Sequence, residues 1–319
     1  MSIIEVKNLV KEFGKEKKSI AVNDISFSIN EGEIVAFIGP NGAGKSTTIK
    51  ILTGILHPTS GEATVCGYTP WKDRTKVTYN IGCLFGQKSQ LNQNLKVIDS
   101  YMLLGAIYDI PKKELFERIN EFTTYFDIKD LINKPANSLS LGQRMICEIV
   151  GSILHKPKVL FLDEPTIGLD IVTKQQVRDL ILKLNKQYGM TVILTSHDIG
   201  DVEYLCEKIM IINYGQIVLN ENIDKLRDSI LTKMIINVTF DKQLEEGFSK
   251  CIGNAKVLSM KNNSCSLEFD TKTISINDLV SNLSKYSKIL RFDCSSTNLE
   301  TIIYDNFKQM KGAKIWKNI

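Results

Sequence analysis

The sequence has 319 residues, of which 43% are apolar and 24% are charged, with a formal net charge of +4. This composition is typical of a folded globular protein and excludes disordered and fibrous chains, and the length predicts about two domains. The small net charge argues against a nucleic-acid-binding protein, which usually concentrates basic residues in a stripe.

Seven cysteines are scattered along the chain without a C-x-x-C pair, so the spacing of zinc ligands is absent. Their odd number and wide separation predict the reduced thiols of a cytosolic protein. No apolar run approaches the roughly 20 residues that cross a bilayer. The first residues also lack the basic-then-apolar layout of a signal peptide.

The N-terminal part of the chain predicts strands over residues 3–10, 20–29 and 34–38, followed by a helix over 45–56. The third strand is short, apolar and rich in β-branched residues, which is typical of a buried parallel strand. A glycine-rich turn joins this strand to the helix. A strand, a glycine turn and a helix together form the setting of a phosphate-binding loop.

The turn matches the pattern G-x-x-x-x-G-K-[ST] with Gly39, Pro40, Asn41, Gly42, Ala43, Gly44, Lys45, Ser46 and Thr47. Its glycines allow several backbone N–H groups to converge on phosphate oxygens, and the following helix adds its positive N-terminal end. We therefore predict that this loop binds a nucleotide. Lys45 would reach the β- and γ-phosphates, and the Ser46 hydroxyl would ligate Mg²⁺.

Residues 97–155 show apolar positions at helical spacing and few strand signals, which predicts a helical insertion, or subdomain, over about residues 90–155. Strands then return at 159–162 and 191–194, with a helical pattern at 172–188 between them. Alternating strands and helices predict an α/β fold in which helices pack on a largely parallel sheet.

Two carboxylates, Asp163 and Glu164, end the strand at 159–162. Phosphoryl transfer needs a positioned nucleophile and neutralised phosphate charge. We predict that Asp163 holds Mg²⁺ through its water shell and that Glu164 polarises the attacking water. Since an isolated acidic pair at a strand end is usually a solvated loop, this interpretation depends on the phosphate-binding loop.

Beyond residue 226, strand patterns at 234–240, 257–269 and 289–294 alternate with helical patterns at 276–286 and 299–307. This predicts a small α+β domain over residues 226–319, after a first domain over residues 1–225. The second domain fits an accessory role, either in regulation or in dimerisation and packing.

The segment Leu139-Ser140-Leu141-Gly142-Gln143-Arg144 resembles the signature sequence of ATP-binding cassette (ABC) ATPases. The usual form has glycine where this chain has Leu141. The departure is mild, because Ser140, Gly142 and backbone N–H groups do most of the work of the signature. The resemblance implies that the signature, including Gln143, contributes to nucleotide binding.

Further stretches match the motifs of this family in the right order. By this resemblance Gln87 senses and helps to ligate Mg²⁺ and contacts the membrane partner, Asp170 lies in a nucleotide-proximal loop across the dimer seam, and His197 holds the γ-phosphate. Phe13 stands where an aromatic side chain stacks on adenine, the alternative being a plain core residue. The implied catalytic residues are Lys45, Gln87, Glu164 and His197.

The resemblance covers about residues 2–225 and implies a phosphate-loop NTPase fold of the ABC type that binds ATP and Mg²⁺ and hydrolyses ATP. In this family the signature of one subunit completes the phosphate site of another, so we expect a homodimer or a heterodimer of ATPase subunits that ATP closes. Residues 85–91 and 167–170 resemble bacterial exporter ATPases with a separately encoded permease. The resemblance therefore implies a peripheral protein at the cytoplasmic face of the membrane.

Two other functions compete with this interpretation. A non-transport ABC ATPase could act on a ribosome or a nucleic-acid machine, but the chain has one cassette and no sustained heptads between Lys45 and Ser140. A nucleotide-binding scaffold without turnover is disfavoured by the intact Glu164 and His197. The lysines around Trp316 in the tail fit either a contact with a membrane surface or a solvated chain end.

Overall fold

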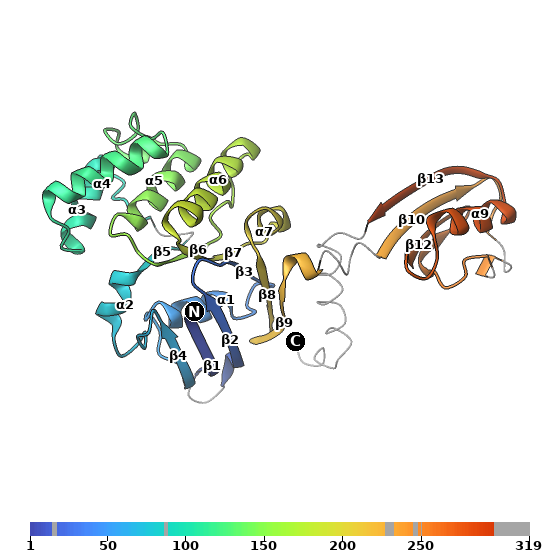
Figure 1. Ribbon diagram of the computed structural model, residues 1–319, viewed down its shortest axis with the longest axis horizontal. Helices are drawn as coiled ribbons and strands as arrows, with labels where there is room; N and C mark the ends of the chain where they lie inside the picture. Colours follow the sequence, from blue (N-terminus) through green and yellow to red (C-terminus); the bar gives the residue numbers. More distant parts are fainter. Residues whose placement is uncertain (15–17, 86–88, 227–232, 245–247, 250, 297–319) are drawn as a thin grey trace. The chain divides into compact units, whose positions relative to one another are not determined.

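The computed structural model describes residues 1–14, 18–85, 89–226, 233–244, 248–249 and 251–296. The chain folds as two compact units, Met1–Glu221 and Asn222–Ile319, each with its own core (Figure 1). The division lies a few residues before the predicted boundary.

A six-stranded sheet forms the centre of the first unit, in the order β5-β6-β7-β3-β8-β9. Its strands are β3 (Ile34–Ile38), β5 (Ile81–Phe85), β6 (Val159–Asp163), β7 (Thr191–Thr195), β8 (Lys208–Asn213) and β9 (Gln216–Asn222). The four pairings from β5 to β8 are parallel. Strands β3 and β7 are buried along their whole length, as strands covered on both faces should be.

A second sheet of the first unit is antiparallel and has the order β2-β1-β4, with β1 (Ser2–Phe13), β2 (Ser19–Asn30) and β4 (Ser60–Val65). Buried and exposed residues alternate along β2, which is typical of a sheet with one solvated face. The buried side chains of β1 and β2 join the same apolar core as those of β3 and helix α1 (Lys45–Leu52). This packing supports the strand and the helix that carry the phosphate-binding loop.

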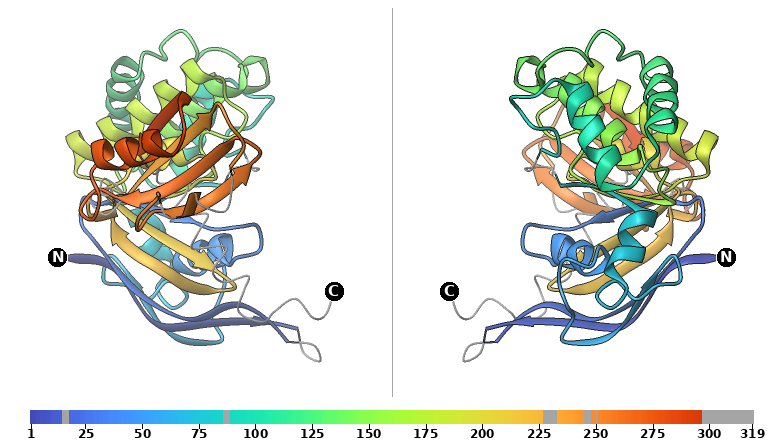
Figure 2. Two further views of the ribbon diagram at one scale, coloured as in Figure 1. Left: turned by 90° about the vertical axis from the view of Figure 1, so that its right-hand side faces the viewer. Right: turned by 90° about the vertical axis from the view of Figure 1, so that its left-hand side faces the viewer.

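The remaining helices of the first unit are α2 (Arg74–Asn80), α3 (Val97–Ile107), α4 (Lys112–Tyr125), α5 (Leu141–Ile153), α6 (Ile171–Tyr188) and α7 (Ile199–Leu205). Figures 1 and 2 show α3, α4 and α5 grouped at the opposite end of this unit from the β1, β2 and β4 sheet. The predicted helical insertion is therefore confirmed. Within the described parts of the chain, none of the helices combines the length and the apolar character that a bilayer crossing needs.

The second unit contains a four-stranded antiparallel sheet in the order β11-β12-β10-β13 and the helix α9 (Ile276–Tyr286). Its strands are β10 (Lys233–Phe240), β11 (Lys256–Lys261), β12 (Ser264–Asp270) and β13 (Ile289–Ser296). Alternate residues of β10 and β12 pack with Leu279 and Leu283 of α9 in a separate core. The predicted helix at 299–307 and the basic tail lie outside the described residues.

The prediction of a single strand over 257–269 is wrong. The structure has two strands there, β11 and β12, which pair antiparallel. They meet at Asn262, whose φ of 44° is the left-handed conformation that asparagine tolerates in tight turns. The polar run Lys261-Asn262-Asn263-Ser264 is the turn signal in the sequence.

Candidate functional site

The phosphate-binding loop leaves the end of β3, inside the central sheet, and leads into α1. A side chain on Gly39 would come within 2.1 Å of the Ile212 carbonyl oxygen. Gly44 has a φ of 110°, and a side chain there would meet the Ala21 carbonyl oxygen at 2.4 Å. Glycine is therefore required at both positions, because the loop backbone packs directly against β2 and β8.

Lys45 lies beneath this loop with only 7% of its surface exposed. Its Nζ donates hydrogen bonds to the carbonyl oxygens of Gly39 and Pro40, the latter at 3.2 Å. Burial lowers the pKa of Lys45, and the nearby Glu164 and Asp163 carboxylates oppose this shift. The loop residues above it, from Pro40 to Gly42, are exposed, so a ligand can approach the loop from solvent.

Thr195, at the end of β7, forms hydrogen bonds with both acidic residues at the end of β6. Its hydroxyl donates to Asp163 Oδ1 at 2.6 Å and accepts from the Glu164 backbone N–H at 3.1 Å. The Thr195 side chain is fully buried, so these bonds are shielded from water. Sequence analysis did not identify Thr195, because a threonine at a strand end is an ordinary strand residue.

Glu164 and His197 face each other across the ends of β6 and β7. The His197 backbone N–H donates to Glu164 Oε2 at 3.3 Å, and His197 Nε2 lies 3.2 Å from Oε1. Glu164 Oε1 is buried, and no donor among the described residues has hydrogen-bond geometry to it. Burial raises the pKa of Glu164, with His197 and Lys45 acting against the shift. A raised pKa makes the carboxylate a stronger base, which suits a group that accepts a proton during catalysis.

The signature residues form the N-terminus of α5. Ser140 Oγ accepts from the Gln143 backbone N–H at 3.2 Å, and Gln143 Oε1 accepts from the Ser140 N–H at 3.1 Å. This reciprocal pair is a capping box. The Gln143 side chain, predicted to contribute to nucleotide binding, is thus engaged in the cap of its own helix.

Asp170 caps the neighbouring helix α6 in a similar way. Its carboxylate accepts from the backbone N–H groups of Val172 and Thr173, both at 3.0 Å, and from the Thr173 hydroxyl at 2.6 Å. These hydrogen bonds, the Thr173 hydroxyl first, lower the pKa of Asp170. A side chain on Gly168 would lie 3.3 Å from Leu141, so the signature and the loop before α6 are neighbours.

The predicted site residues therefore fall into two groups. The first group lies at the carboxyl ends of strands β3, β6 and β7, where parallel α/β sheets bind their ligands. It consists of Lys45, Asp163, Glu164 and His197. The second group surrounds the N-termini of α5 and α6, and no hydrogen bond or ion pair among the described residues joins it to the first. Phe13 is 42% exposed at the end of β1 and is not a core residue. Gln87 lies outside the described residues.

The comparisons with known proteins agree on one family. Residues 22–167 match the ABC transporter family. The chain is 34% identical over 229 residues to the uncharacterized ABC transporter ATP-binding protein YhcH of Bacillus subtilis, covering 70% of this chain and 73% of that protein. It is 35% identical over 216 residues to the linearmycin resistance ATP-binding protein LnrL of the same organism, covering 68% of each. The chain belongs to the ABC transporter ATP-binding proteins.

Solved ABC ATPase cassettes share its fold. The cassette MJ0796, captured as a post-hydrolysis dimer with ADP and Pi, aligns with a TM-score of 0.62 at 28% identity over 69% of this chain and 98% of that one. The cassette cbiO1 from Clostridium perfringens, part of the transporter complex cbiONQ, aligns with a TM-score of 0.64 at 29% identity over 71% of this chain and 91% of that one. The predicted α/β fold, the recognition of the family and the ATPase activity are thus confirmed.

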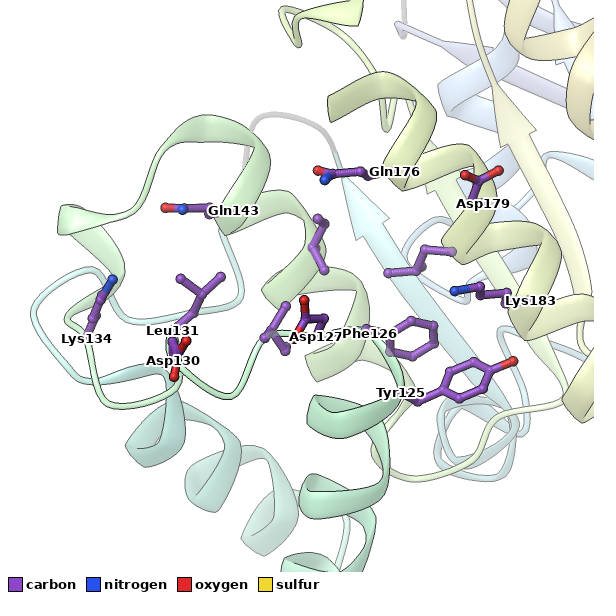
Figure 3. A pocket seen from close by; sticks show the side chains of 13 residues that line it. Tyr125, Phe126, Asp127, Asp130, Leu131, Lys134, Gln143, Gln176, Asp179 and Lys183 are labelled. Carbon is purple, nitrogen blue, oxygen red and sulfur yellow. The ribbon is translucent and has the colours of Figure 1, made fainter. Parts of the chain in front are cut away.

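This ABC ATPase also has a cavity of about 540 Å³ between the end of α4, α5 and α6 (Figure 3). It is lined by charges of both signs, including Asp127, Lys134 and Asp179. Asp179 already accepts a hydrogen bond from the Tyr204 hydroxyl at 2.8 Å. Neither Lys45 nor Glu164 lines this cavity, so it is separate from the phosphate-binding loop.

Proposed function

We propose that this chain is the ATP-hydrolysing subunit of an exporter whose permease is a separate protein. The observation that carries the proposal is the convergence of Lys45, Glu164 and His197 at the ends of three neighbouring strands. A phosphate-binding lysine, a carboxylate and a histidine suit the hydrolysis of a γ-phosphate.

In this proposal each residue has one task. The loop N–H groups and Lys45 hold the β- and γ-phosphates, and Phe13 stacks on the adenine from the end of β1. Glu164 accepts a proton from the attacking water. His197, whose side chain is 48% exposed beside Glu164, donates to the γ-phosphate and stabilises the charge that develops there.

The residues at this site also fit a magnesium ion. Ser46 lies in the first turn of α1 and is exposed. The Asp163 carboxylate lies at the end of β6, close enough for its charge to affect the pKa of Lys45. Hydroxyl and carboxylate oxygens are the protein ligands that Mg²⁺ prefers, with waters and phosphate oxygens completing its shell. Bound there, Mg²⁺ would neutralise phosphate charge, and Gln87 is proposed as a further ligand.

We infer that two ATPase subunits close on ATP. Ser140 and Gly142 lie at the N-terminus of α5, whose positive end favours an anion. Since no hydrogen bond or ion pair among the described residues links them to their own phosphate-binding loop, a second subunit is the natural source of the phosphate. The dimeric MJ0796 cassette supports this arrangement, and the partner can be a second copy or a related chain.

The membrane partner and the direction of transport are also proposals. LnrL is described as a resistance protein, which favours export, and cbiO1 is part of a multi-subunit transporter complex. Leu103 and Ile107, one turn apart on α3, are 53% and 60% exposed. Apolar side chains this exposed on one helix face suit a contact with a permease at the cytoplasmic face of the membrane.

The test is affinity purification of a tagged Glu164→Gln variant from detergent-solubilised native cells with ATP and Mg²⁺, followed by mass spectrometry. We expect a stoichiometric multi-span membrane protein. Leu103→Asp with Ile107→Asp, added to Glu164→Gln, should lose this protein, whereas the same two substitutions in the wild-type chain should leave ATP turnover in place. Glu117→Gln, a substitution at an exposed position of α4, is the control. Recovery of ribosomal or nucleic-acid-bound proteins without a membrane partner would contradict the transport function and favour the non-transport alternative.

A further inference from the structure

A fully buried carboxylate, Asp201 of α7, lies behind the Glu164–His197 pair. Arg178 of α6 donates to its Oδ1 from Nε at 2.7 Å and pairs with it through Nη2 at 2.5 Å. Its Oδ2 accepts from the Ser196 hydroxyl at 3.0 Å and from the Thr166 hydroxyl. Asp201 has 0% of its surface exposed, and Thr166 and Ser196 have 2% each.

Each of the two hydroxyl donors is close in sequence to one member of the Glu164–His197 pair. Thr166 follows Glu164 by two residues, and Ser196 immediately precedes His197. One carboxylate oxygen therefore binds the loop after β6 to the loop after β7, at the positions that carry the two facing residues. Glu164 itself has a φ of 55°, so its backbone conformation needs support from its surroundings.

We propose that Asp201, held by Arg178, is the positioning centre of the ATPase site and sets the distance between Glu164 and His197 through Thr166 and Ser196. The inference rests on the proposed roles of Glu164 and His197. It concerns positioning residues only, since none of the four contacts the nucleotide in this account. Arg178 and the two hydroxyls together satisfy a charge that would otherwise be costly to bury.

Helix α6 contributes a second link to the same loop. Lys174, one turn before Arg178, donates to Asp198 Oδ2 at 2.7 Å, and Asp198 follows His197 directly. The N-terminus of α6 is capped by Asp170, in the loop beside the signature. The helix thus connects that loop to the Glu164–His197 pair, and a shift of α6 would move His197 through the ion pairs of Lys174 and Arg178 with Asp198 and Asp201.

A packing role alone would also explain a buried ion pair, so the test removes one hydroxyl and keeps the ion pair. Thr166→Val replaces a hydroxyl by a methyl group of similar size, leaving Asp201 and Arg178 in place. Thr166→Ser restores the hydroxyl and serves as the conservative rescue. Thr123→Val is the matched control, because Thr123 is 1% exposed in α4 and donates only within its own helix.

The measurement on the full-length chain is steady-state ATP hydrolysis together with ATP affinity. For Thr166→Val we expect kcat to fall about tenfold, the effect of one displaced hydrogen bond on a transition state. We expect KM and the dissociation constant of ATP to stay within about twofold, since the phosphate-binding loop is untouched. Thr166→Ser should recover most of the activity, and Ser196→Ala should reproduce the loss.

Two outcomes would overturn the inference. One is a kcat for Thr166→Val equal to that of Thr123→Val, and the other is an equal loss in Thr166→Ser. Glu164→Gln in the same assay separates this result from the proposed function. If Glu164→Gln keeps normal turnover, the assignment of the site fails, whereas an inactive Glu164→Gln beside a fully active Thr166→Val removes only the positioning role.

Discussion

At the residue scale, the largely buried Glu164 carboxylate is proposed to serve catalysis, but its ionised form lowers the stability of the fold. Its carboxylate is 18% exposed, its Oε1 has no donor with hydrogen-bond geometry among the described residues, and burial raises its pKa above the ordinary value of 4.5. A carboxyl whose pKa is raised on folding binds its proton more tightly in the folded than in the unfolded state. Its ionised form therefore lowers stability at every pH above the ordinary value.

Glu164→Gln should therefore stabilise the nucleotide-free chain. At pH 7.5 we expect the thermal unfolding midpoint to rise by about 1–3 °C, as a gain of up to about 1 kcal/mol would give. The gain should shrink as the pH is lowered and should be lost below 4.5, because the wild-type carboxyl is then protonated in both states. Differential scanning fluorimetry across this pH range measures it, with Glu117→Gln as the control, and a lower midpoint in Glu164→Gln would contradict the pKa direction.

How well single residues could be predicted depended on whether they belong to a local pattern. Lys45 and Glu164 stand in motifs that the sequence displays directly. Thr195 and Asp201 do not, because their roles arise from contacts between segments far apart in the chain. Gln143 stands in the signature, yet its visible contact is the cap of α5, a pattern of Ser followed three residues later by Gln that the sequence also contains.

At the element scale, α5 and α6 approach each other closely at Gly142. A side chain on Gly142 would come within 2.0 Å of Thr173 Cγ2, while the Thr173 Cβ and Oγ1 atoms would lie at 3.1 and 3.2 Å. The signature glycine therefore has a packing role in addition to its proposed role at the phosphate. Any larger residue at position 142 therefore changes the contact between the two helices.

This close contact predicts a rescue between two substitutions. Gly142→Ala should lower the free energy of unfolding by about 1–3 kcal/mol through overpacking, despite the better helix propensity of alanine. Thr173→Ser removes Cγ2 but keeps the hydroxyl that donates to Asp170. In chemical denaturation the double variant should recover most of the loss, and simple addition of the two effects would show that the helices do not meet there.

Elements with a clear period and a clear end were predicted well from sequence. Strand β3 and helix α9 have the predicted bounds, while α1 ends at Leu52, because Gly54 turns the chain with a φ of 73°. The strands β4, β5, β8 and β9 were not predicted. The places of β4 and β5 in the sheets depend on pairing with distant strands. Strand β8 was missed although its apolar run over 209–212 is a strand signal, and β9, its neighbour in the sheet, was missed with it.

At the scale of the whole molecule, the first unit carries the complete set of described site residues, and the second has its own sheet and core. The sequence could predict this division because the composition and the strand pattern change near residue 226. The partner could not be predicted in the same way, because no local pattern of the sequence records which surface meets a second chain. Resemblance to the family supplied that expectation.

The measurement that tests the account most directly is the molar mass in solution of the full-length Glu164→Gln variant, by light scattering, with saturating ATP and Mg²⁺. Hydrolysis should be at least about 100-fold slower in this variant, the effect of losing one catalytic group. The ATP should therefore persist between two phosphate-binding loops and two signatures. The account predicts a dimer with ATP and a monomer with ADP, and a monomer under both conditions would contradict a site shared between two copies.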